Sequence, residues 1–173
     1  MRVGAAGFWA AIVVVVVGCT PALDWRDVRP EGSDLTMLFP CRPDRQERRV
    51  QIGAAVSTMR MDTCRASGML FSLAFVDATD AAAVGPTLAT LRASAAANIG
   101  AVTTVQRLDI AGATPNAESA LVRMQGRLAD GRTRTERAAF FAHGMRVYQA
   151  AMLGESLPDD TAETFFGAIK VRP

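Results

Sequence analysis

The stretch AESALVRMQGRLADGRTRTERAAFFAHGMRVYQAAML, residues 117–153, decides the fold of this chain. It predicts three strands, over residues 117–128, 132–142 and 145–153, because runs rich in apolar residues are separated by two turn dipeptides. The turns are Asp130-Gly131 and His143-Gly144, and Asp-Gly is among the strongest short signals for a β-hairpin. The stretch therefore predicts an antiparallel meander.

Further strands are predicted on the N-terminal side of the meander. Residues 35–40 (LTMLFP) form a short strand that Pro40 ends. Residues 69–76 (MLFSLAFV) are apolar on both faces, which predicts a strand in the centre of the sheet. Strands are also expected over residues 49–52, 56–64 and 103–110.

Two helices are predicted, one before the meander and one after it. The first follows Pro86 and has apolar residues at spacings of three and four, namely Leu88, Leu91, Ala95 and Ile99. The second begins after Pro158, and its buried stripe consists of Ala162, Phe165, Phe166 and Ile169. Because strands and helices do not alternate strictly, we expect an α+β domain with a mainly antiparallel sheet and two helices.

The N-terminus has the layout of a secretory signal. Arg2 supplies a positive charge, residues 8–17 form an unbroken apolar run, and Gly18 is a small residue directly before Cys19. The run is shorter than the about 20 residues that a helix needs to cross a bilayer. We therefore assign residues 1–18 to a signal peptide, residues 19–33 to a tether, and residues 34–173 to a single globular domain.

The sequence Val16-Val17-Gly18-Cys19 resembles the lipobox of bacterial lipoproteins. The resemblance implies that the leader is cut before Cys19, that the Cys19 thiol carries a diacylglyceryl group, and that the new amino terminus is acylated, as with palmitate. Several acyl chains on one residue anchor a protein stably, whereas a single chain binds only marginally. We expect a membrane-anchored lipoprotein that faces the periplasm, and Thr20 in place of Asp favours the outer membrane. An ordinary signal peptide or an uncleaved anchor is the alternative.

Residues 35–171 resemble the PsbP-like α/β/α sandwich. The match rests on Phe39-Pro40 at the end of an early strand, on a long helix followed by a meander, and on Phe165-Phe166 near the end. That family includes photosystem accessory proteins and bacterial proteins of unknown role. The resemblance therefore implies binding or assembly rather than catalysis.

Lipidation of Cys19 leaves Cys41 and Cys64 as an even pair in an exported protein. Such a pair is most simply a structural disulfide. Two thiols without a nearby histidine make an incomplete metal site, and their spacing is not that of a Cys-x-x-Cys redox pair. We expect no metal and no cofactor.

Basic residues gather at two places in the sequence. The hairpin around Asp130-Gly131 carries Arg123, Arg127, Arg132, Arg134 and Arg137. A second cluster consists of Arg42, Arg45, Arg48 and Arg49. The hairpin arginines are either a binding surface for lipid headgroups, an anionic polymer or an acidic partner, or a solvated face whose charges discourage edge pairing. The net charge of +2 and the lack of interleaved aromatic residues argue against nucleic acid as a partner.

Catalysis is the least favoured function. The single histidine, His143, lies in a predicted turn, where a catalytic side chain would be poorly held. The leading hypothesis is a lipid-anchored cell-envelope protein whose domain binds or scaffolds a partner protein and is not an enzyme. The alternative is a periplasmic carrier of a small ligand, with a pocket near Phe71, Phe75, Phe140 and Tyr148. An envelope enzyme ranks last.

Overall fold

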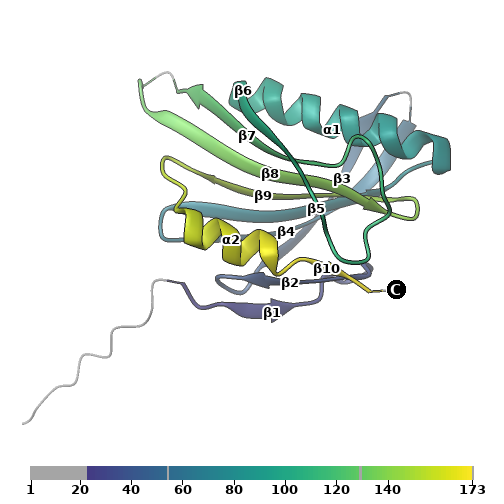
Figure 1. Ribbon diagram of the computed structural model, residues 1–173, viewed down its shortest axis with the longest axis horizontal. Helices are drawn as coiled ribbons and strands as arrows, with labels where there is room; N and C mark the ends of the chain where they lie inside the picture. The colour runs from purple at the N-terminus through teal and green to yellow at the C-terminus, as the bar shows by residue number, and fades with distance from the viewer. Residues whose placement is uncertain (1–22, 54, 129, 173) are drawn as a thin grey trace, which may run out of the picture.

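The computed structural model describes residues 23–53, 55–128 and 130–172, and Figure 1 shows the arrangement of their elements. The first half of the chain contains β1 (Arg26–Val28), β2 (Leu35–Phe39), β3 (Asp44–Ile52), β4 (Ala55–Ala66), β5 (Met69–Asp77), a short 3₁₀ helix η1 (Ala81–Ala83) and α1 (Val84–Ile99). The second half contains β6 (Ala101–Arg107), β7 (Ala120–Arg127), β8 (Thr133–His143), β9 (Arg146–Gly154), α2 (Asp159–Gly167) and β10 (Lys170–Val171).

The strands form two sheets. A seven-stranded sheet has the order β3-β4-β5-β9-β8-β7-β6, and a small sheet has the order β1-β2-β10. All the strand pairs are antiparallel. The predicted α+β class, with a mainly antiparallel sheet and two helices, is confirmed. The predicted meander corresponds to β7, β8 and β9, and its bounds differ from the prediction by only a few residues.

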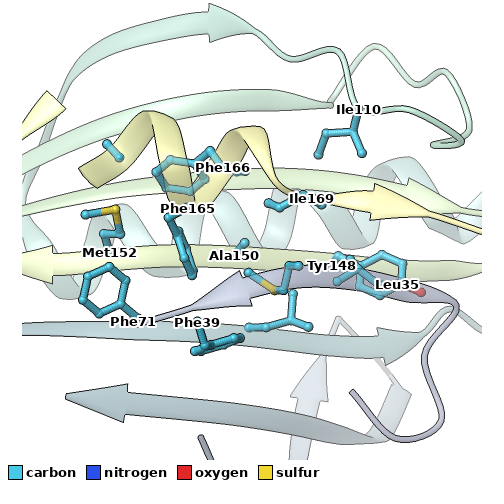
Figure 2. Close-up of a cluster of buried hydrophobic side chains, with 14 of the residues drawn as sticks. Leu35, Phe39, Phe71, Ile110, Tyr148, Ala150, Met152, Phe165, Phe166 and Ile169 are labelled. Atoms are coloured by element: carbon cyan, nitrogen blue, oxygen red, sulfur yellow. The ribbon is translucent and has the colours of Figure 1, made fainter. Parts of the chain in front are cut away.

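Figure 1 shows α1 on one face of the large sheet and α2 with the small sheet on the other. A hydrophobic cluster lies on each face. α1 covers one face, where its Leu88 and Leu91 pack with Val122 and Met124 of β7. α2 and the small sheet cover the other face, where Phe39, Phe71 and Phe165 meet (Figure 2). Side chains of a strand alternate between the two faces, so neighbouring residues of β8 contribute to different clusters.

Small residues let α1 approach the sheet closely. The strands beneath it present Ala120, Ala138, Ala142 and Ala151. At the C-terminal end of the helix, the chain passes directly over Gly126 of β7. A Cβ atom on Gly126 would lie 1.7 Å from the carbonyl oxygen of Ile99, so only glycine fits at this crossing.

The disulfide predicted from the cysteine count is present. Cys41, directly after β2, is bonded to Cys64 of β4, with 6.0 Å between their Cα atoms. Cys64 is buried, and the bridge therefore fastens the small sheet to the large one at the edge of the core. The prediction that Cys41 and Cys64 pair is confirmed.

β1 lies inside the segment that the sequence assigns to a tether, residues 19–33. Arg26 pairs with Phe39 across β1 and β2, and the Trp25 ring lies edge-on to Phe71 with 6.2 Å between ring centroids. Pro30 and Ser33 are also buried. The folded domain thus begins before the predicted boundary at residue 34. This short strand has no recognisable hydropathy pattern, because its apolar residues stand singly between charged ones.

β3 is much longer than the predicted strand over residues 49–52. It begins at Asp44 and pairs with β4 along its whole length. Nearly all of its side chains are exposed. Backbone pairing holds this strand at the edge of the sheet without apolar burial, and for that reason hydrophobic periodicity does not detect its first half.

Candidate binding surface

The predicted arginine cluster is divided between the two faces of the large sheet. Arg123 of β7 stands directly opposite Arg137 of β8, and both lie on the face that α2 covers. Arg134 lies on the other face, because every second residue of a strand points to the same side and Ala138 of β8 belongs to the cluster under α1. The five arginines therefore do not form one continuous basic patch.

Most of these arginines are engaged with neighbouring groups. Arg132 contacts the carboxylates of Asp130 and Glu155, each at 2.7 Å. The backbone N–H of Arg132, and after it the guanidinium of the same residue, lower the pKa of Asp130. The Arg127 side chain donates a hydrogen bond to the carbonyl of Gly131. These contacts stabilise the β7–β8 turn, so Arg127 and Arg132 serve the hairpin itself.

Two of the five arginines, Arg123 and Arg134, have no hydrogen-bond or ion-pair partner for their guanidinium groups among the described residues, and the charge of Arg134 acts on Glu136 on the other face. On the face that α2 covers, Arg123 is therefore the unpaired arginine. Its neighbour Arg137 is paired with Asp159 of α2, at 2.8 Å. Like charges directly opposite each other destabilise a sheet, and Asp159 balances only one of these two. Both arginines line a hollow of about 170 Å³ together with Thr104, Gln106, Leu121, Val122 and Asp159. The hollow therefore carries an uncompensated positive charge.

β6 forms the open edge of the sheet next to this hollow. All seven of its residues are exposed. Val102 and Val105 are two of the four large apolar side chains that are exposed in the described residues, at 45% and 59%. The sequence predicts a strand here but gives no sign that it lies at an edge.

His143 has a structural contact. Its Nδ1 atom lies 2.9 Å from the carbonyl oxygen of Gly112, and the backbone N–H of Gly144 donates to the Thr114 side chain. Both contacts fasten the long connection between β6 and β7 to the turn between β8 and β9. In the part of the chain that the structure describes, no group of three or more His, Cys, Asp or Glu side chains is placed to hold a metal ion.

The four aromatic residues proposed for a carrier pocket do not line one pocket. Phe71, Phe75 and Tyr148 belong to the cluster under α2, whereas Phe140 belongs to the cluster under α1. All four are at most 3% exposed. Phe141 and Tyr148 stack with 5.0 Å between ring centroids, which fills the interior between them. The four residues do not surround a common pocket, because the large sheet separates Phe140 from the other three.

Two carboxyl groups are buried at positions that the sequence does not predict to be buried. Asp62 of β4 is 4% exposed, with Arg45 at 3.6 Å from its Oδ1 atom. Burial raises the pKa of Asp62, and Arg45 offsets this in part. Glu136 of β8 is 6% exposed, and its Oε1 atom has no hydrogen-bond partner among the described residues. Burial raises the pKa of Glu136 to about 7, although Gln149 and Arg134 lower it in part.

Because Glu136 is buried, we predict that the free energy of unfolding falls as the pH rises from mildly acidic to mildly alkaline values. Its pKa rises from an ordinary value of 4.5 to about 7 on folding, so the folded state holds the extra proton within this window. Stability therefore falls as the pH rises through it. We expect Glu136→Gln to remove about 2 kcal/mol of this loss between pH 5 and pH 8. Urea unfolding at both pH values measures it.

Glu163→Gln is the matched control, since Glu163 is an exposed glutamate on α2. That variant should keep the pH dependence of the wild type. If Glu136→Gln also keeps it, the carboxyl of Glu136 does not hold a proton at neutral pH.

Comparisons with known proteins identify no family for this chain. No family model matches it, and no curated protein matches it. Among solved structures, a crystal structure of a protein from Bacteroides thetaiotaomicron VPI-5482 is similar over 80% of this chain and 45% of its own, with 13% sequence identity and a TM-score of 0.42. The chain thus spans less than half the length of that protein. A likeness at this level carries no argument about function.

The predicted lipidation site, Cys19, lies outside the described residues, as does the whole predicted signal peptide, residues 1–18. Within residues 23–53, 55–128 and 130–172, no helix is both long enough and apolar enough to span a membrane.

Proposed function

We propose that this chain is a lipid-anchored protein of the bacterial cell envelope whose folded domain binds a partner protein and catalyses no reaction. The proposal rests on one contrast: the interior of the domain is filled with side chains, whereas one edge of the large sheet is exposed. The aromatic residues fill the two hydrophobic clusters, whereas β6 and the hollow beside Arg123 are exposed. A domain of this kind offers an exposed surface and an open strand edge to a macromolecular partner.

The anchoring half of the proposal rests on Val16-Val17-Gly18-Cys19, where a short apolar run ends in a small residue and a cysteine. The Cys41–Cys64 disulfide supports export, because structural disulfides persist in oxidising compartments such as the periplasm. We place the domain on the periplasmic side, attached to the outer membrane in preference to the inner one.

The non-catalytic half rests on how the reactive side chains are used. His143 holds a loop through the carbonyl of Gly112, and both Cys41 and Cys64 are consumed by the disulfide. A nucleophile and a base within hydrogen-bond reach of each other define most covalent active sites. Among the described contacts of His143, none is to a serine, a cysteine or a carboxylate.

We expect Cys19→Ser to release the protein from the membrane, because the variant lacks the thiol that would carry the lipid. Membrane fractionation followed by mass spectrometry of the extracted protein measures both the release and the acyl mass on Cys19. Thr20→Ala is the matched control and should remain bound. Unchanged membrane retention of Cys19→Ser would instead indicate an uncleaved anchor.

Partner binding is tested by crosslinking before the protein is extracted from the membrane. A photo-crosslinking residue at Val105 of β6 should yield one discrete envelope protein, and the same residue at Val56 of β4 should not. Both valines are exposed, at 59% and 64%, so access alone does not distinguish them. Equal crosslinking from both positions would contradict a partner site at the β6 edge. A small molecule retained in native mass spectrometry would favour the carrier.

A further inference from the structure

The two edges of the seven-stranded sheet are protected very differently. An edge strand presents unpaired N–H and C=O groups, and proteins guard such edges with charged side chains. β3, at one edge, has five charged residues among its nine. β6, at the other edge, has one charged residue, Arg107, and no described strand pairs with its outer side. β6 therefore has the composition of an edge that accepts a further strand.

A β-bulge gives β6 two chemically distinct sides. The register with β7 shifts between Val102 and Thr104. As a result, Val102 and Val105 stand opposite Met124 and Val122, on the face that α1 covers. Residues that are directly opposite share a face of the sheet. The side of β6 toward α1 thus carries two exposed valines, with Arg107, opposite Ala120, at the end of the strand.

The other side of β6 is polar and lies beside the unbalanced charge. Thr104 stands directly opposite Arg123, and Gln106 stands opposite Leu121. Neighbouring strands lie about 4.8 Å apart, so an added strand would be about 10 Å from the backbone of β7. An extended arginine side chain is long enough to span most of that distance, and Thr104, which lines the hollow together with Arg123, has a short side chain. An acidic residue on the added strand would complete the contact with Arg123.

We propose that the outer edge of β6 binds an extended acidic segment of a partner protein as an eighth strand of the sheet. Resting on the proposed partner-binding function, this inference names the partner's chemistry. Glutamate or aspartate side chains of the segment face Arg123, and its alternate residues are apolar and face Val102 and Val105. Main-chain hydrogen bonds to β6 supply affinity, and the alternation supplies specificity.

A second copy of this chain is a poorer occupant of the edge. Pairing β6 with another β6 would place Arg107 and Arg123 of both copies in the same region. Like charges brought together at an interface disfavour association. An acidic segment neutralises Arg123, whereas a second copy doubles the positive charge.

The test uses the full-length protein in detergent and a short acetylated and amidated peptide that alternates glutamate and valine. A second peptide carries glutamine in place of glutamate. We expect saturable binding of the acidic peptide, binding at least about tenfold weaker for the neutral one, and slower amide hydrogen exchange over residues 101–107 in the complex. Rising salt should weaken only the acidic peptide.

Three variants separate the contributions to binding. Arg123→Gln should weaken the acidic peptide about tenfold and leave the neutral peptide unchanged. Arg134→Gln is its matched control, since Arg134 lies on the same hairpin but on the opposite face, and it should have no effect. Val105→Glu places a negative charge on the open edge in place of an apolar contact and should abolish binding of both peptides, with the melting temperature unchanged because the side chain is exposed.

Equal affinity for the two peptides, no saturable binding, or full binding by Val105→Glu would each overturn the inference. So would concentration-dependent dimers of the full-length protein that Val105→Glu dissolves, since the edge would then be occupied by a second copy. If the peptide fails but a partner still crosslinks at another surface of a Cys19-anchored protein, this inference falls and the proposed function stands.

Discussion

Replacing Phe165 with alanine is expected to lower the free energy of unfolding by about 3–5 kcal/mol, as large-to-small substitutions of buried aromatic residues do. Phe165 of α2 is fully buried. Its ring makes edge contacts with Phe39 of β2, Phe71 of β5 and Phe166, with centroids 5.7, 5.2 and 5.1 Å away (Figure 2). Removing it leaves a cavity where the small sheet, the large sheet and α2 meet.

Denaturant unfolding of the wild type and of Phe165→Ala measures this loss. Met145→Ala is the control, because Met145 is 52% exposed and its truncation should change the stability by no more than about 0.5 kcal/mol. A loss below about 1 kcal/mol for Phe165→Ala would mean that α2 is not a structural part of this core.

Loss of the Cys41–Cys64 disulfide is the second large effect. The bond joins residues 23 apart in sequence, and closing a loop of that size stabilises a protein by about 3 kcal/mol in the chain-entropy account. We expect the Cys41→Ala/Cys64→Ala variant to melt about 6–12 °C below the wild type. Alanine suits position 64, since Cys64 is buried and a serine there would bury a hydroxyl group.

Calorimetry with and without a reducing agent provides the check. The reductant should lower the melting temperature of the wild type toward that of the double variant and leave the double variant unchanged. A wild type whose melting temperature ignores the reductant, and whose two thiols alkylate freely in the native state, would show that the bridge is absent in solution.

Strong local patterns explain why much of the fold can be predicted from the sequence. Turn chemistry at Asp130-Gly131 and the apolar runs around it define the meander, and a spacing of three and four places α1 and its buried Leu88 and Leu91. Once Cys19 is assigned to a lipid, the two remaining cysteines predict the disulfide. The turn and the helix depend on interactions between residues that are close in sequence, and the disulfide depends on a residue type that is rare in this chain.

The elements that escape prediction depend on contacts distant in sequence. The exposed strand β3 is held by its pairing with β4, and β1 is held by Phe39 and Phe71. The face on which an arginine lies follows from strand register, so the separation of Arg123 from Arg134 is invisible in the sequence. The same holds for the burial of Asp62 and Glu136, each of which sits in a strand with exposed charged neighbours.

The small sheet has a consequence for when the domain is able to fold. β2 pairs on one side with β1, which precedes it closely, and on the other side with β10, near residue 171 (Figure 1). Pairing across almost the whole domain carries a large loop-closure entropy and comes late in folding. During synthesis, the small sheet therefore stays incomplete until β10 has emerged.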